Sequence, residues 1–169
     1  MKILLILVIS VFTNNFLAQK TFSSKSVLGH ELGAAFSTHA QVVDYFEELN
    51  RVFPNNSKLE IYGESHEGRT LQLMFIGSEN TIKNLEQVRN NHINTSVNEN
   101  IPIVWLSYNV HGNESSGTEA AMETALILLR DKKEWLDNVL IIIDPCLNPD
   151  GRDRYVNFFK QYSSYAKNF

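Results

Sequence analysis

The chain has 169 residues, of which 43% are apolar and 20% are charged, a balance typical of a globular domain and not of a disordered chain. Its formal net charge of -4 at pH 7 argues against the basic surface that nucleic-acid-binding domains present. We therefore expect one folded domain with no nucleic-acid partner. Composition does not predict its oligomeric state.

The first 18 residues have the pattern of a secretory signal peptide. Lys2 precedes an apolar run at 3–12, which has the length of a signal-peptide hydrophobic region and is too short to span a bilayer as a helix. Cleavage after Ala18 would release the mature chain. We expect an exported protein, periplasmic or extracellular, with no stable membrane span; a retained membrane anchor is the alternative.

The first part of the mature chain predicts a helix and a hairpin. Residues 19–36 are predicted to form an extended segment that leads into the domain. Ser37 is then predicted to cap a helix that ends near Phe53, since apolar residues recur there at helical spacing. Strands are predicted at 58–62 and 70–76, on either side of a turn that contains two glycines.

The second part alternates helices and strands. Helices are predicted at 81–92 and 116–130, and strands at 102–108 and 139–143. The last of these strands is a continuous β-branched run, which indicates a strand buried on both faces, as in a parallel sheet. The chain after Arg152 shows no clear period. The predicted fold class is α/β, with a mixed central sheet flanked by helices.

Cys146 is the single cysteine, so the chain cannot form an internal disulfide. It follows the predicted buried strand, and its sequence neighbours include no histidine. We interpret it as a small apolar residue near the core and not as a nucleophile.

A His-Gly-Asn-Glu turn at 111–114 lies between a predicted strand and a predicted helix. His111 and Glu114 can converge if the turn is helix-like, and they offer a nitrogen and oxygens to a metal. Taken alone, a hydrogen-bonded turn histidine is the alternative. Ligands of open α/β sheets bind beyond the carboxyl ends of strands, so Asn148 and Asp150, in the turn after the next strand, are expected nearby.

Three motifs together resemble those of the zinc carboxypeptidases. They are Gly-Glu-Ser-His-Glu-Gly-Arg-Thr-Leu at 63–71, His-Gly-Asn-Glu at 111–114 and Asn-Pro-Asp-Gly at 148–151. The resemblance covers about residues 37–155 and is greatest with the bacterial exported branch. Three ordered motifs at compatible spacing are far more specific than any one of them.

The resemblance implies that 37–169 is the N-terminal part of a truncated, zinc-carboxypeptidase-like catalytic domain. The family releases C-terminal amino acids from peptides or proteins, with water activated by one Zn2+ ion. His111 and Glu114 match its first two metal ligands. The expected partners are therefore peptide or protein C-termini.

The family's third zinc ligand, a histidine, and its general-base glutamate both lie downstream of the Asn-Pro-Asp-Gly turn. No histidine follows His111 in this sequence, and no glutamate follows Glu134. The resemblance therefore implies a fragment that contains no catalytic residue and is inactive alone. The remaining histidines are interpreted as surface or turn residues: His30, His39, His66 and His92.

Three arginines near the motifs need an interpretation. Arg69 in the hairpin turn is interpreted as a structural ion-pair partner. Arg152 is interpreted as a solvated surface charge. Arg154 is a candidate for substrate binding, with a solvated surface charge as the equal alternative.

Two other functions are open. Zinc deacylases of the aspartoacylase type also place His-Gly-x-Glu after a strand, but the turn at 63–71 and the motif at 148–151 favour the peptidase. A non-catalytic pseudoenzyme or binding module would explain the missing residues. Sequence beyond residue 169 would separate these alternatives.

Overall fold

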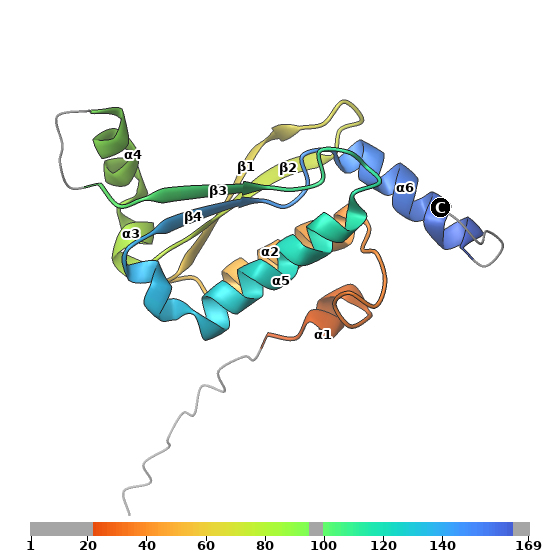
Figure 1. Cartoon of the computed structure of the whole chain (residues 1–169), viewed down its shortest axis with the longest axis horizontal. Helices are drawn as coiled ribbons and strands as arrows, with labels where there is room; N and C mark the ends of the chain where they lie inside the picture. The colour runs from red at the N-terminus through yellow and green to blue at the C-terminus, as the bar shows by residue number, and fades with distance from the viewer. Residues whose placement is uncertain (1–21, 95–99, 164–169) are drawn as a thin grey trace, which may run out of the picture.

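A four-stranded sheet in the order β1-β2-β4-β3 forms the centre of the fold (Figure 1). The computed structural model describes residues 22–94 and 100–163. β4 is antiparallel to β2 and parallel to β3, and β1 is antiparallel to β2. The sheet is therefore mixed, as predicted. The strands are β1 (Ser57–Glu64), β2 (Thr70–Ile76), β3 (Ile103–Ser107) and β4 (Leu140–Asp144).

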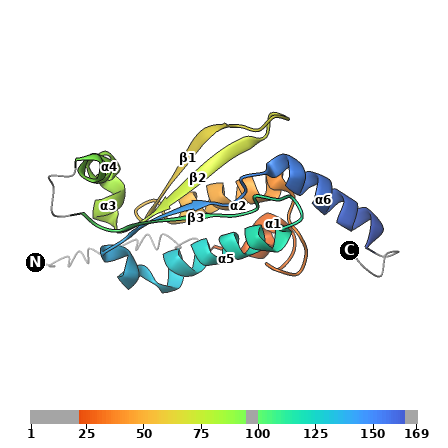
Figure 2. The ribbon, with the colours of Figure 1, turned by 45° about the horizontal axis from the view of Figure 1, so that its top comes forward.

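Helices α2 (His39–Val52) and α5 (Ser115–Asp131) lie side by side against one face of the sheet (Figure 2). Their apolar side chains meet alternate residues of β2 and β4. Burying each large apolar side chain contributes about 1.5–3 kcal/mol, so this layer supplies most of the core energy. Its fully buried members include Val42, Phe46, Leu49, Met74, Ile76, Met122, Leu129 and Ile143.

The predicted helix after residue 37 is present, but its cap differs. Thr38 is the N-cap and forms a capping box with Gln41, whose Oε1 accepts from Thr38 N at 2.8 Å. Ser37 is instead buried, and its backbone N–H donates to Glu119 Oε1 at 2.7 Å. The start of α2 is thereby tied to α5.

The two parallel strands differ in burial although both are apolar. All five residues of β4 are buried, which confirms the predicted strand buried on both faces. β3 lies at the edge of the sheet, and β4 is its one strand partner among the described residues. Val104 is 42% exposed and Trp105 is 60% exposed. An apolar edge of this kind is a template for pairing with a further strand.

Two predicted segments are wrong in their secondary structure. The segment at 19–36, expected to be extended, contains the short helix α1 (Ser24–Leu28). The single helix expected at 81–92 is two helices, α3 (Glu79–Lys83) and α4 (Leu85–Ile93). The break falls at Asn84, whose φ of -118° and ψ of 31° leave the helical region.

Helix α6 (Pro149–Tyr162) occupies a stretch that the sequence predicted as a turn and an aperiodic tail. The reason lies in its first residues. Asn148 caps the helix by accepting from Gly151 N at 2.9 Å, and Pro149 occupies the first turn, where its missing N–H costs nothing. A short 3-10 helix, η1 (Lys133–Asp137), joins α5 to β4.

The predicted signal peptide at 1–18 lies outside the described residues. In the described part of the chain, no helix has both the length and the hydropathy needed to cross a membrane.

Candidate metal centre

The turns after β3 and β4 lie side by side at one edge of the sheet, because these strands are parallel neighbours. Leu147 N donates to Tyr108 O at 3.0 Å, and Asn148 N donates to Asn109 O at 3.1 Å. These bonds join the turn that follows β4 to the loop that follows β3. The predicted meeting of the two turns is therefore confirmed.

His111 and Glu114 converge within the loop after β3. His111 Nδ1 lies 3.0 Å from Glu114 Oε1, and His111 N donates to Glu114 Oε2 at 3.1 Å. These two hydrogen bonds hold the pKa of Glu114 below its ordinary value, so the carboxylate is ionised at neutral pH. The two side chains are 73% and 52% exposed, and solvent reaches both.

The donor types and spacing of this pair fit zinc. Zinc takes imidazole nitrogen and carboxylate oxygen at about 2.0–2.2 Å, so two donors that share one ion lie within about 4 Å of each other. The 3.0 Å separation meets that condition. Across the described residues, no group of three or more His, Cys, Asp or Glu side chains is placed to hold a metal. The described chain therefore brings together two side chains whose donor atoms suit zinc, whereas a hydrolytic zinc uses three protein donors.

Comparison of the chain with known proteins identifies its family. The family model of the zinc carboxypeptidases matches residues 42–165, which is more than half of the chain. The chain belongs to the zinc carboxypeptidase family. The family is zinc-dependent, and the matched region contains the whole loop with His111 and Glu114.

Individual zinc carboxypeptidases match this chain over a small part of their own length. Carboxypeptidase D of Drosophila melanogaster is 29% identical over 122 residues, which is 69% of this chain and 8% of that protein. The structure of carboxypeptidase A from Helicoverpa armigera is 23% identical with a TM-score of 0.56, covering 80% of this chain and 32% of that one. Bovine thrombin-activatable fibrinolysis inhibitor is 15% identical with a TM-score of 0.53, covering 70% and 33%. At these identities the structural matches show the shared fold, and the chain spans about a third of each.

The carboxypeptidase motif at 148–151 contributes differently at its two polar residues. Asn148 borders the loop between β3 and α5, residues 108–114, which we call the metal loop because it contains the candidate ligands. Its Nδ2 donates to Val110 O at 3.1 Å. Asp150 is instead held by the hairpin, where it accepts from Ser65 Oγ at 2.6 Å and from Arg69 Nη1 at 2.7 Å. Of the two residues expected near His111, Asn148 is hydrogen-bonded to the loop, whereas Asp150 is hydrogen-bonded to the hairpin.

Arg69 ties the hairpin turn to α6. Besides its bond to Asp150, its Nε donates to Asp153 Oδ2 at 2.8 Å, and its Nη1 also pairs with Glu67. The interpretation of Arg69 as a structural ion-pair partner is confirmed. Arg154 pairs with the same Glu67 and is 72% exposed, so the structure places it on the surface beside the hairpin.

Arg152 is the clearest correction to the sequence interpretation, since it is fully buried and not a solvated charge. Its guanidinium donates to Ser37 O at 3.0 Å, to Ser115 O at 2.9 Å and to Glu119 Oε1 at 2.7 Å. Ser115 directly follows the metal loop, so Arg152 fixes the first residue of α5 there. The available signal was Glu119, an acidic residue next to the apolar run at 120–122.

His39 is also buried and is not a surface residue as expected. Its Nε2 lies 2.8 Å from Thr70 O, and its backbone N–H donates to Asp153 Oδ1 at 2.8 Å. Burial lowers the pKa of His39. His66 and His92 are exposed as predicted, and His30 is half-buried.

Cys146 is buried and free, which confirms its structural interpretation. Its Sγ lies 3.2 Å from Asn109 Oδ1, and burial raises the pKa of the thiol to about 12. A thiol of that pKa stays protonated at neutral pH and is a poor nucleophile.

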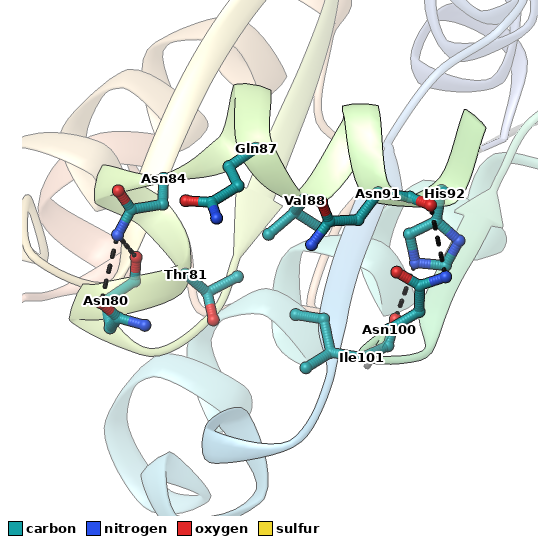
Figure 3. Close-up of a pocket in the computed structure, with 9 residues that line it drawn as sticks. All are labelled: Asn80, Thr81, Asn84, Gln87, Val88, Asn91, His92, Asn100 and Ile101. Atoms are coloured by element: carbon teal, nitrogen blue, oxygen red, sulfur yellow. Dashed lines mark hydrogen bonds between the residues drawn. The ribbon is translucent and has the colours of Figure 1, made fainter. Parts of the chain in front are cut away.

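A polar hollow of about 260 Å3 lies between α3, α4 and Ile101 (Figure 3). Asparagine amides line it and bond locally: Asn84 Nδ2 donates to Asn80 O at 2.8 Å, and Asn100 Nδ2 to Asn91 O at 3.3 Å. The hollow lies near the N-terminal end of β3, whereas the metal loop follows the C-terminal end of that strand. It is therefore not part of the metal centre.

Proposed function

We propose that this chain is the N-terminal part of an exported metallocarboxypeptidase domain that removes C-terminal amino acids from peptides or proteins with one Zn2+ ion. The observation that carries the proposal is the 3.0 Å approach of His111 Nδ1 and Glu114 Oε1 in a zinc carboxypeptidase chain. The apolar run at 3–12 supports export, periplasmic or extracellular. The segments at 27–29 and 151–155, which have counterparts in the exported bacterial branch, support that branch.

His111 and Glu114 would hold the ion, which when bound polarises a carbonyl and activates water. Glu114 is ready for this role because its carboxylate is ionised at neutral pH. The backbone bond from His111 N to Glu114 Oε2 orients the carboxylate next to the imidazole. Their exposure at the edge of the sheet leaves room for further ligands and for a peptide C-terminus.

We further propose that the third ligand, the general base and the groups that bind the substrate carboxylate belong to sequence beyond residue 169. Two observations support this. The chain spans about a third of the matched structures, and the apolar edge of β3 exposes Trp105. The chain alone would then bind zinc weakly and would lack peptidase activity.

Zinc titration of the purified chain by calorimetry tests the ligand assignment. We expect one ion per chain, with binding lost in His111→Ala and in Glu114→Ala. His66→Ala is the matched control, because His66 is exposed on the hairpin turn and should leave the affinity unchanged.

Activity separates the alternatives. The chain and a longer protein that continues beyond residue 169 would be assayed with peptides and with acylated amino acids. The proposal predicts chelator-sensitive release of C-terminal residues by the longer protein only. Hydrolysis of acyl-amino acids in preference to peptides would favour the deacylase, and inactivity of a longer protein that binds zinc would favour a non-catalytic module.

A further inference from the structure

Two asparagine amides donate to consecutive carbonyl groups of the metal loop. Asn148 Nδ2 donates to Val110 O at 3.1 Å, and Asn109 Nδ2 donates to His111 O at 2.8 Å. Both bonds fix the backbone on either side of the His111 α-carbon. They come from different turns, one after each parallel strand.

Asn109 also sets the direction in which the chain leaves β3. Its φ of 57° is in the left-handed region, which asparagine tolerates better than most residues with a side chain. The side chain is buried, and its Oδ1 accepts from Cys146 Sγ at 3.2 Å. Both ends of this amide therefore have partners, which fixes its orientation.

Asn148 performs two separable roles. Its Oδ1 caps α6 by accepting from Gly151 N, while its Nδ2 reaches across to Val110 O. Any good N-cap residue can supply the first bond. The second bond needs a donor of the length and direction of the amide, so a substitution can remove it and keep the cap.

The loop rests directly on the first turn of α6. A Cβ built on Gly112 would lie 2.2 Å from the carbonyl carbon and oxygen of Gly151, so there is no space for any side chain at Gly112. The first turn of α6 is itself fixed to the hairpin through Asp150 and Asp153. The position of the loop is thus set by the N-terminal turn of α6, which ion pairs hold against the hairpin.

We propose that Asn109 and Asn148 are positioning residues that hold the backbone of the metal loop so that His111 and Glu114 stay together. This inference rests on the proposed zinc site for its consequence, but its structural part does not need a metal. Loss of a group that orients a metal ligand typically weakens metal binding by about 10–100-fold, and we expect an effect of this kind when either amide is removed.

The test uses substitutions that remove one amide donor and keep the local conformation. Asn148→Ser and Asn148→Asp both retain an N-cap acceptor, and the serine variant adds no charge. Asn109→Gly retains access to the left-handed region. Asn84→Ser is the matched control, since the Asn84 amide bonds to Asn80 in α3, away from the loop.

Zinc affinity and thermal unfolding are measured together by calorimetry and circular dichroism. We expect zinc affinity to fall about tenfold in Asn148→Ser and Asn148→Asp, with unfolding midpoints close to that of the parent chain. Asn84→Ser should keep the parent affinity. Unchanged zinc affinity in both Asn148 variants would overturn the inference. A loss of affinity found only in variants whose unfolding midpoint also falls would overturn it as well, because general destabilisation would then explain the loss.

Amide hydrogen exchange in the metal-free chain keeps the inference testable if the zinc assignment fails. Asn148→Ser and Asn109→Gly should speed exchange at His111 and Glu114 at least several-fold, while exchange at Arg152, inside α6, stays unchanged. If His111→Ala leaves zinc binding intact, the metal assignment fails, and the exchange result decides the positioning role alone. Unchanged exchange throughout 110–114 would contradict it.

Discussion

The loop after β3 and the strand that leads into it are organised in opposite ways. The loop is surrounded by partners from its own chain: two asparagine amides, the Gly151 backbone and the buried Arg152 that holds Ser115. The edge of β3 is apolar and exposed, with Trp105 turned to solvent. The candidate metal donors are therefore held together by contacts among the described residues, whereas the apolar side chains at the edge of β3 have few partners among them.

The largest predicted effect removes the buried anchor of the loop. Arg152→Ala leaves the Glu119 carboxylate buried without its counter-charge, so the free energy of unfolding should fall by about 3–5 kcal/mol in urea denaturation. The double variant Arg152→Met, Glu119→Leu should recover only part of that loss, because it buries no unpaired charge but leaves the buried Ser37 N–H and the Ser115 carbonyl without these partners. Arg130→Ala, at a solvated pair with Asp131, is the control and should unfold close to the parent midpoint.

The second prediction compares two glycines on either side of Glu114. Gly112→Ala forces a methyl group into the Gly151 backbone, so stability should fall by about 1–3 kcal/mol and zinc affinity at least tenfold. Gly117→Ala meets nothing nearer than Tyr108 Cδ1 at 3.8 Å and should raise helix stability by up to about 1 kcal/mol. Equal behaviour of the two variants would show that the loop does not rest on α6.

The third prediction concerns the pH dependence of stability and His39, whose backbone N–H donates to Asp153 of α6. Its pKa is lower in the folded chain than the unfolded value of about 6.5, so the unfolded chain binds the proton more readily. Stability should be intact above about pH 6.5 and decrease as the pH falls from there toward the folded pKa. The thermal midpoint of His39→Gln should depend less on pH between about 7 and 5. An identical pH profile in the variant would contradict this assignment.

The smallest effect on stability is expected at the edge of β3. Val104→Lys places a charge on the exposed strand, so it should leave the unfolding midpoint nearly unchanged and reduce self-association, measured by sedimentation. Trp135→Lys, an exposed apolar position on η1, is the control for a general gain in solubility. If both variants reduce association equally, the strand edge has no special role.

The sequence predicted the parts of this fold whose cause is local. The β-branched run at 139–143 indicates a strand buried on both faces, and the spacing of His111 and Glu114 predicts that their side chains converge; both are observed. Arg152 and His39 were misread because their partners lie far along the chain, at Glu119 and Thr70. A pattern of neighbouring residues does not contain such contacts.

Helix α6 was missed for a different reason. Asparagine followed by proline also begins turns, and that signal led to the prediction of a turn. The aromatic residues that follow do recur at helical spacing, at 155, 158, 159 and 162, so the sequence held a helix signal that the prediction did not use. The cap at Asn148 starts the helix locally, and the ion pairs of Arg69 with Asp150 and Asp153 stabilise it from the hairpin.

Anomalous diffraction at the zinc absorption edge, from crystals of the chain grown with zinc, tests the assignment of His111 and Glu114 as zinc ligands. We expect one strong peak in contact with His111 Nδ1 and a carboxylate oxygen of Glu114, and no such peak in crystals of Glu114→Ala. A zinc peak at His66 or His92 instead, with the loop at 111–114 empty, would contradict it.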